Sequence, residues 1–174
     1  MANIVPEGMI NFKVYRDSVD MLGIAEGTLP NLEAMTHEIK GAGVAGVVDK
    51  PILGHYNSIT LSLTWRSVTG DISILNRPMA HDLDLYQALQ RWDGGRGEVA
   101  TEQLHVFCKA IPKTLTTGNL VVADAMGTQM EFEIPYLKIW LGGTERIELD
   151  KYNYICKIDG VDYLASVRAD LGMQ

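Results

Sequence analysis

Alternating apolar and polar residues mark several stretches of this chain as β-strands. The clearest stretch alternates strictly between apolar residues and threonine, serine or arginine, with the apolar positions at Ile59, Leu61, Leu63 and Trp65. Side chains on one face of a strand repeat every second residue, so this pattern is typical of a half-buried strand. The same alternation places Ile10, Phe12 and Val14 on the inward face of a second strand over residues 10–15, and a looser one predicts a third strand over residues 104–109.

In two places the alternation changes phase. Glu131 and Glu133 occupy odd positions, but beyond Pro135 the polar position moves to Lys138. A single regular strand cannot do this, so we expect a bulge or bend at Pro135. A similar change near residues 150–151 predicts a second irregularity of this kind. Strands that switch faces favour a bent sandwich or a barrel.

Glycine-containing turns separate the predicted strands at residues 94–97, 117–119, 142–143 and 159–160. Glycine supplies the positive φ that tight hairpins need. Residues 82–92 also fit helical spacing, but a hairpin turn follows them, which favours a strand.

Two short helices are predicted beside these strands. The first covers residues 71–76, with Asp71 as its cap and Pro78 as its stop. The second covers residues 161–171 near the C-terminus, and Gly172 ends it. Because the predicted strands outnumber the predicted helices, we expect a mainly β, antiparallel fold.

The chain has 174 residues and no shift in composition that would mark a linker, so we expect one domain, 1–174, with flexible ends that include an N-terminal arm over residues 1–9. No apolar run is long enough to span a membrane, and the first residues lack the pattern of a signal peptide. We therefore expect a soluble protein made in a cytoplasm, without stable membrane insertion.

Charge and cysteine content narrow the function further. With a net charge of −7 the sequence shows no basic stripe to neutralise phosphates, so we expect no electrostatic binding of nucleic acid. Acidity instead suits a surface that nucleic acid passes without sticking. Cys108 and Cys156 lie far apart among apolar neighbours, which predicts two buried thiols rather than a redox or metal pair.

Motifs for catalysis, metals or cofactors are weak in this sequence. Gly41, Gly43 and Gly46 spell GxGxxG, but Pro51 and Gly54 interrupt any following helix, and the required acidic residue is missing. The four histidines lack metal-site spacing, and a solvated turn accounts for the cluster around residues 81–84. We predict no catalytic residues, no cofactor and no metal.

Several stretches together resemble the major tail tube proteins of contractile-tailed bacteriophages and related phage-tail-like particles. They are INFKVYRDSVDMLGIAEGTLPNL at residues 10–32, EIKGAGVAG at 38–46, ITLSLTWRS at 59–67 and PYLKIWLGGTERIELDKYNYICKIDGVDYLASVRADLG at 135–172. The last stretch is the most specific, because its strand and turn motifs follow one another in the same order as in the family. Residues 68–97 depart from the family in length and composition.

The resemblance implies two packed antiparallel sheets with a small flanking helix. It also implies hexameric rings whose inner strands close a β-barrel lumen, stacked into a tube. Closure around a ring satisfies strand edges that one copy leaves unpaired, which agrees with this expectation. Ring contacts close on themselves, whereas ring-to-ring contacts stay open and propagate.

Members of the family reach the adjacent ring with a long loop, and the matching position is residues 38–55. Its predicted inter-ring residues are Glu38, Gly41, Gly43, Gly46, Asp49 and His55. Glycines would keep the free loop flexible, so that docking orders it and assembly waits for an initiator. Candidates for the lumen wall are either the two carboxylates or a row of hydroxyls, namely Glu131 and Glu133, or Thr60, Ser62 and Thr64.

The implied partners are further copies of the chain, a tail sheath protein, baseplate or initiator proteins, a tail terminator, and double-stranded DNA that passes without specific binding. The implied location is a virion tail assembled in the bacterial host. Two alternatives stay open: a tube of a contractile secretion system that delivers proteins, and a monomeric β-barrel that binds a small ligand in an apolar interior pocket.

Overall fold

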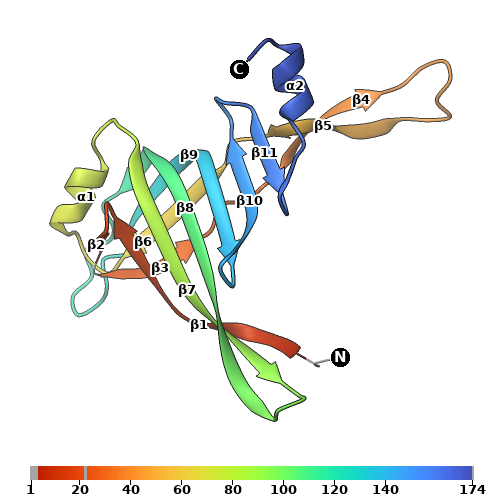
Figure 1. The fold of residues 1–174 in the computed structure, drawn as a ribbon. Coiled ribbons are helices and arrows are strands. Elements are labelled where there is room, and N and C mark those ends of the chain that lie inside the picture. The colour runs from red at the N-terminus through yellow and green to blue at the C-terminus, as the bar shows by residue number, and fades with distance from the viewer. Residues whose placement is uncertain (1–3, 22, 174) are drawn as a thin grey trace.

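The computed structural model describes residues 4–21 and 23–173, without the side chain of residue 20. These residues form strands and two short helices (Figure 1). In chain order they are β1 (Ile4–Arg16), β2 (Val19–Asp20), β3 (Ile24–Thr28), β4 (Ala34–Ile39), β5 (Val48–Tyr56), β6 (Thr60–Trp65), α1 (Gly70–Leu75), β7 (His81–Asp93), β8 (Glu98–Thr116), β9 (Thr128–Leu141), β10 (Thr144–Asp150), β11 (Ile155–Ile158), β12 (Val161–Asp162) and α2 (Ala165–Asp170). The described residues include no helix long and apolar enough to cross a membrane.

Two packed antiparallel sheets share the long strands β8 and β9 (Figure 1). The first sheet joins β1, β7, the earlier part of β8, the later part of β9, β10 and β11. The second sheet joins β3, β6, the start of β9 and the end of β8. The mainly β, antiparallel fold predicted from the sequence is therefore confirmed.

The passage from one sheet to the other occurs at a bulge in β9. Lys109 of β8 lies opposite Tyr136, and Ile111 lies opposite Glu133, so one residue of β8 faces both Ile134 and Pro135. Both of these β9 residues are buried, so buried and exposed positions stop alternating here. The sequence shows the same break in its apolar and polar positions. The bulge predicted at Pro135 is confirmed.

The core fills the space between the two sheets. The second sheet contributes the apolar positions of the strict alternation, and Ile59, Leu61, Leu63 and Trp65 are each at most 1% exposed. Met130 and Phe132 of β9 lie beside them and are also buried. The first sheet contributes the buried residues Val14, Leu83, Leu85, Val106 and Cys108. Both cysteines are buried free thiols, as predicted.

Residues 82–92 form strand β7, as predicted, and the first helix forms almost where the pattern placed it. The N-cap of α1 is Thr69, not Asp71, and no side chain caps it. Asp71 lies in the first turn instead, with its carboxylate 3.5 Å from Arg16 of β1.

The N-terminal arm is a second correction. The described part of it, residues 4–9, belongs to β1, and Ile4 lies opposite Asp93 at the far end of β7. Ile10, predicted to face the core, is 53% exposed, because the pairing of β1 with β7 shifts register between Met9 and Asn11. A bulge residue has no partner across the ladder, so the alternation fails there.

The C-terminal region contains two further corrections. Residues 161–171 do not form one helix, because β12 precedes the short helix α2. The phase change at residues 150–151 is a turn between two strands, not a bulge within one. The Asp150 carboxylate accepts hydrogen bonds from the backbone of Tyr152 and Asn153, and Tyr154 adopts a φ of 52°. A local side-chain to backbone contact of this kind is a common way to form a turn.

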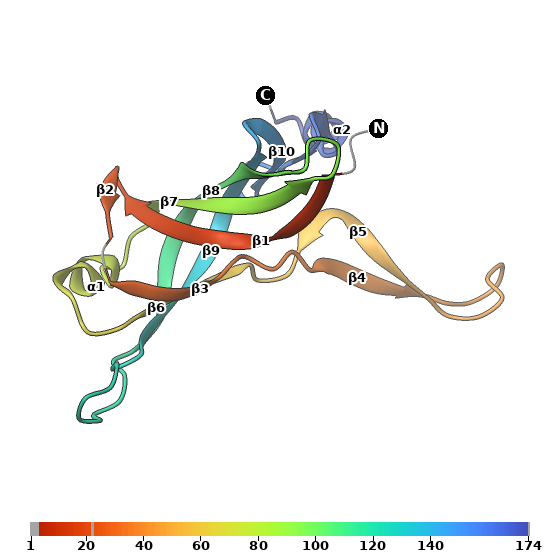
Figure 2. The ribbon, with the colours of Figure 1, turned by 90° about the horizontal axis from the view of Figure 1, so that it is seen from below.

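Strands β4 and β5 form a separate two-stranded ribbon that projects from one end of the sandwich (Figure 2). We call residues 34–56 the arm. The segment 38–55, described above as a loop, is thus mostly paired strand, and only residues 40–47 connect the two strands. The ribbon leaves most of its side chains exposed, because no core covers either of its faces.

Candidate functional site

Both sets of candidate lumen residues meet on one face of the second sheet. Strands β6 and β9 pair so that Thr60 lies opposite Glu133, and Ser62 lies opposite Glu131. Residues directly opposite in an antiparallel pair share a face, so hydroxyls and carboxylates alternate across it. Their chain neighbours point into the core. The sequence offered these sets as alternatives, and the structure brings them together as one polar face.

The carboxylates on this polar face differ in their surroundings. Glu133 accepts a short hydrogen bond from Ser58 and lies 3.5 Å from the ammonium of Lys151, which also donates to the Asn57 carbonyl. Glu131 has no ion pair among the residues that the structure describes. The charge of Glu133 is therefore partly neutralised, and Glu131 is the less compensated carboxylate at the centre of the face.

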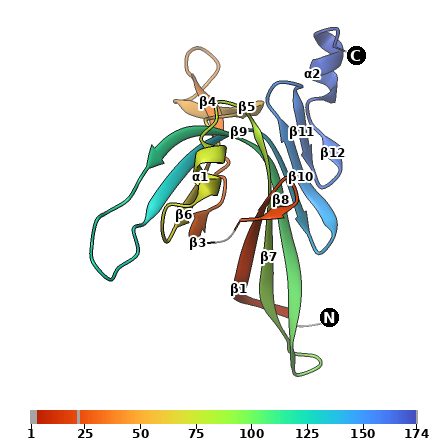
Figure 3. The same ribbon diagram turned by 90° about the vertical axis from the view of Figure 1, so that its left-hand side faces the viewer.

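The polar face continues to both edges of the second sheet. At one edge, Glu26 and Thr28 of β3 lie opposite Thr64 and Ser62. At the other edge, Thr114 of β8 lies opposite Glu131. In the described part of the chain, β3 has no other strand partner, and neither does the end of β8 (residues 111–116). Figure 3 shows β8 as the outermost strand on its side of this sheet.

The predicted inter-ring residues lie along the arm rather than at one point. Glu38 and Asp49 face each other across β4 and β5. Gly41, Gly43 and Gly46 lie in the connecting turn with φ between 92° and 133°, values that side chains other than glycine rarely adopt. His55 lies at the base of the arm, where its ring meets that of Tyr154 edge to face at 6.4 Å.

Sequence reasoning missed a stacked row of side chains on the outward face of the first sheet. The ring of His105 lies between Tyr86 and Trp140, at centroid distances of 4.2 and 4.6 Å. Asp84 contacts the same imidazole at 2.7 Å. All four residues occupy the outward positions of their strands, and only pairing β7, β8 and β9 in register would have shown that they meet.

Charged groups on the same face pair with one another near β10. Glu148 accepts hydrogen bonds from Tyr136 and Lys157, and Lys138 bridges it to Glu145. Burial opposes ionisation of Glu148, but these bonds outweigh it and lower the pKa of the carboxyl. The hydrogen bond to Glu145 raises the pKa of Lys138. Each charge in this group is thus held by its neighbours.

Further along, Arg168 of α2 donates to Asp162 at 2.6 Å and lowers the pKa of that carboxyl. The same guanidinium donates to the Tyr154 carbonyl. This pair fastens the C-terminal helix to β12 and the preceding turn.

In the described part of the chain, the groups that could carry chemistry lie apart or are paired with other residues. The described residues contain no group of three histidines, cysteines or carboxylates that could hold a metal. Burial raises the pKa of the Cys108 thiol to about 12, so it is not a thiolate nucleophile. His81 is buried, whereas Asp82 pairs with Lys109 and Asp84 with His105, so the acidic cluster near residue 81 is divided among separate partners.

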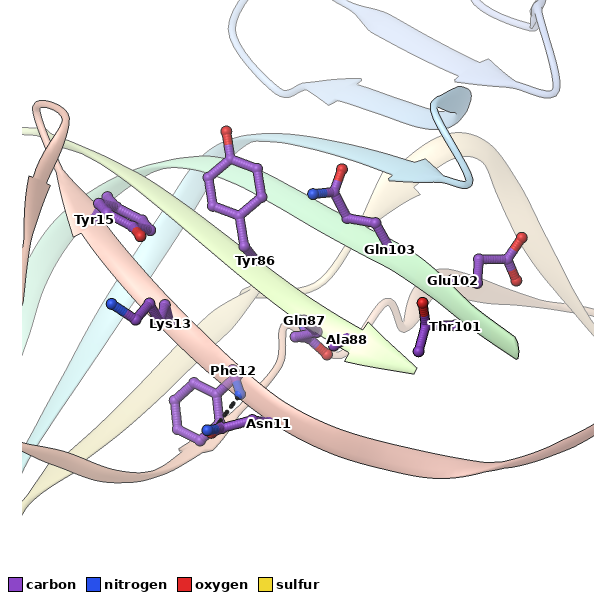
Figure 4. A pocket seen from close by; sticks show the side chains of 10 residues that line it. All are labelled: Asn11, Phe12, Lys13, Tyr15, Tyr86, Gln87, Ala88, Thr101, Glu102 and Gln103. Carbon is purple, nitrogen blue, oxygen red and sulfur yellow. Dashed lines mark hydrogen bonds between the residues drawn. The ribbon is translucent and has the colours of Figure 1, made fainter. Parts of the chain in front are cut away.

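A groove of about 610 Å³ runs across β1, β7 and β8, on the surface of the first sheet (Figure 4). Tyr15 and Tyr86 stand at one side of it, and Thr101, Glu102 and Gln103 line the other. The ligand-binding alternative requires an apolar pocket inside a barrel. This groove is open and lies on the surface of the sheet, not inside a barrel, so it gives that alternative no support.

Comparison with known proteins identifies the family. The model of one family, described as phage tail tube protein FII, matches residues 6–172. The chain belongs to this family. The tail tube protein of Escherichia phage P2 is 24% identical over 176 residues, which cover 97% of this chain and 99% of the relative.

A solved structure also resembles the chain in fold. It comes from the sheath/tube terminator of PVC, an extracellular contractile injection system, in the extended state. That structure aligns with a TM-score of 0.52 and 15% identity, over 75% of this chain and 94% of the other. Membership of the tail tube family makes the chain a structural component of a tail tube, and it bears out the resemblance noted in the sequence.

Proposed function

We propose that identical copies join edge to edge through the second sheet and close into a ring. Strand β3 of one copy would pair with the end of β8 in the next. The observation that carries the proposal is the pair of strand edges, at opposite sides of one sheet, that have no partner in the described residues. An exposed edge of this kind invites another strand, and a closed ring leaves no edge unpaired.

Strand direction supports this joining. The second sheet contains the strands β3, β6, β9 and β8, and each pair of neighbours is antiparallel. Its two edge strands therefore run in opposite directions. Copies related by rotation about a ring axis would bring β3 and β8 together antiparallel, so the alternation continues around the barrel. Hexameric rings, which the family resemblance implies, extend this pattern without a break in direction.

The polar face would then line the lumen, because the opposite face of the sheet is buried in the core. Hydroxyls and carboxylates offer DNA no cationic contacts, and Lys151 beside them is paired with Glu133. The net charge of −7 likewise disfavours binding of DNA. The ring would conduct double-stranded DNA without holding it. A tube that delivers proteins, or one that punctures an envelope, would use the same wall with different cargo.

The remaining partners follow from the tube. The groups on the first sheet face away from the proposed lumen, where a tail sheath protein would surround the tube. Baseplate or initiator proteins and a tail terminator would meet its two ends. In this function the chain catalyses no reaction, and it requires no cofactor or metal.

Disulfide cross-linking tests the edge contact. A Thr28→Cys, Thr114→Cys double variant places one thiol on each edge of the polar face. Within one copy these positions are separated by three strand spacings, roughly 14 Å, which is too far for a disulfide. The native cysteines are buried and do not compete. Oxidation of assembled material should therefore give a ladder of covalent oligomers that ends at the ring size.

A second variant covers the alternative register. Thr28→Cys with Thr116→Cys shifts one thiol by two residues on the same strand edge. Thr28→Cys with Tyr152→Cys is the matched control, because Tyr152 is exposed but lies outside the second sheet. Tubes in which neither edge pair forms a ladder would contradict the proposed contact.

The arm would reach a copy in the adjacent ring. Deleting residues 41–47 would leave only Lys40 between Ile39 and Val48, which pair directly, and that turn is too short. Replacing residues 40–47 by Asn-Gly closes that pair with a two-residue hairpin turn and keeps the ribbon. The variant should stay folded and fail to form tubes. Normal tubes in negative-stain micrographs would refute this role of the arm.

A further inference from the structure

A second protrusion, residues 117–127 between β8 and β9, exposes apolar side chains in one place. We call it the prong. Leu120 is 96% exposed, Val121 59% and Val122 98%. Isolated exposed apolar residues are ordinary on a protein surface, but consecutive ones at the tip of a projecting loop indicate a contact.

The base of the prong is closed by hydrogen bonds. The Asn119 amide donates to the Met126 carbonyl at 2.8 Å, and the Thr128 hydroxyl donates to the Thr117 carbonyl at 3.0 Å. A side chain at Gly118 would collide with the Met126 backbone. The two sides of the loop are therefore held close together, and the apolar tip projects from a defined base.

The prong and the arm lie at opposite ends of the second sheet (Figure 2). Strand β6 connects the two ends: β5 of the arm ends at Tyr56, just before it, and the Met126 amide of the prong donates to Arg66, just after it. The strand between them has six residues, which span roughly 20 Å. If the second sheet surrounds a lumen, the two protrusions point towards different rings.

We call the end of the second sheet that carries the prong and Arg66 the prong end. The arm has side chains that could complement it. Near its tip, Val47 is 64% exposed and Val48 49%. Glu38 and Asp49 lie directly opposite each other, a pairing of like charges that is unfavourable unless a cation relieves it. Lys40 reaches Glu38 at 2.8 Å, which leaves Asp49 as the carboxylate still to be matched.

At the prong end, the exposed side chain of Arg66 forms no ion pair among the residues that the structure describes. We propose that the prong and Arg66 of one copy receive the arm of a copy in the next ring. Leu120 and Val122 contact the apolar tip of that arm, and Arg66 pairs with its Asp49. The inference rests on the proposed tube, and it names the surface that the arm meets.

The symmetry of such a contact explains why the rings stack. The arm and the prong end are different surfaces, so each copy has one of each to offer. A contact between unlike surfaces that does not close on itself continues along an axis. Every added ring then presents the same unused surface to the next one.

A charge exchange tests the pairing. Asp49→Arg and Arg66→Asp each place like charges in contact, and the yield of sedimented tubes should fall at least roughly tenfold, because like-charge contacts cost several kcal/mol. The double variant restores opposite charges and should recover tubes. Both positions are exposed, so the chain should fold in every case, which circular dichroism checks.

A second pair of variants tests the apolar contact. Leu120→Asp with Val122→Asp should leave single rings that do not stack. Asn119→Asp adds a charge to the same loop without removing apolar surface, and it should assemble as the parent does. Loss of stacking in the control as well would overturn the assignment of Leu120 and Val122.

Failure of this inference differs from failure of the proposed function. If the parent chain forms tubes and the single charge variants do too, the arm meets another surface and the inference is wrong. An exchange variant that stays unstacked overturns the pairing as well. If the parent forms neither rings nor tubes when given an assembly initiator, the proposed function fails first, and the inference with it.

Discussion

On the outward face of the first sheet, the imidazole of His105 stacks between two aromatic rings and meets Asp84, and Glu148 is held by three neighbours. On the outward face of the second sheet, small hydroxyl side chains alternate with carboxylates, and Glu131 at its centre has no ion pair within the described residues. The two faces therefore differ in how far one copy satisfies its own polar groups.

The strand edges differ less than the faces. The first sheet continues from β10 through β11 to β12, where Arg168 of α2 pairs with Asp162, and at its other side β1 pairs with β2 only at residues 15–16, so residues 4–14 have no second strand partner within the described residues. The second sheet stops at β3 and at the end of β8, both available for pairing. The outward face of the first sheet is largely satisfied within one copy, whereas the second sheet has a less compensated face between two strand edges, the features expected of a surface completed by neighbours.

The largest expected effect separates the two sides of the second sheet. Phe132 is fully buried, so Phe132→Ala should lower the free energy of unfolding by about 3–5 kcal/mol. Its chain neighbour Glu131 points the other way, and Glu131→Ala should change stability by less than about 0.5 kcal/mol. Urea denaturation below the assembling concentration measures both. Equal losses would mean that the polar face is not an outward face.

A smaller effect is expected where the first sheet satisfies its charges. Glu148→Gln leaves Lys138 and Lys157 without their shared carboxylate and should cost about 1–3 kcal/mol. Glu133→Gln is the matched change on the second sheet, where the carboxylate is more exposed, and it should cost less. The same denaturation curves compare the two, and a larger loss at Glu133 would reverse the contrast between the sheets.

The loss of folding stability at acidic pH should also depend on carboxyl groups of the first sheet. Glu148 and Asp162 have lowered pKa values in the folded chain, against ordinary values of 4.5 and 3.8. The unfolded chain then binds more protons as pH falls, so their stabilisation is present above these ordinary values and is lost as pH drops through the folded ones. Glu148→Gln should make the curve of stability against pH shallower below about pH 5. An unchanged slope would exclude Glu148 as a source.

Reversing the charge on the polar face should have the smallest effect on folding stability. Its effect on function should be larger. Glu131→Lys together with Glu133→Lys should leave assembly largely intact and slow the passage of DNA, because each lysine adds a phosphate contact. Glu131→Lys alone is the cleaner variant, since it leaves the contacts of Glu133 with Ser58 and Lys151 in place. Unchanged ejection kinetics with normal tubes would remove both residues from the lumen.

The sequence predicts the parts of the fold where burial follows a regular period. Leu61 and Leu63 are buried because one face of β6 meets the core, and alternation records that directly. Pro135 marks the bulge because its effect on the alternation is local. The polar face could be predicted only as two separate rows, since pairing β6 with β9 is a tertiary fact that periodicity does not contain.

The errors occur where the core does not impose a pattern. The arm has strands although it contains Pro51 and Gly54, because an exposed ribbon has no buried face to produce alternation. The first part of β1 projects along β7 in the same way. At the C-terminus, we predicted one helix over residues 161–171, but its first residues form a short strand that is followed by a tight turn. The prong was visible only as a glycine turn, although its three consecutive apolar residues were a signal that could have been used.

The most direct test of the account is a cryo-electron microscopy structure of tubes assembled from this chain. It should place residues 24–28 of one copy in hydrogen-bonded register with residues 111–116 of its neighbour, and the Glu131 carboxylate on the inner wall. A tube in which those two edges remain apart, or in which Glu131 faces outward, would contradict it.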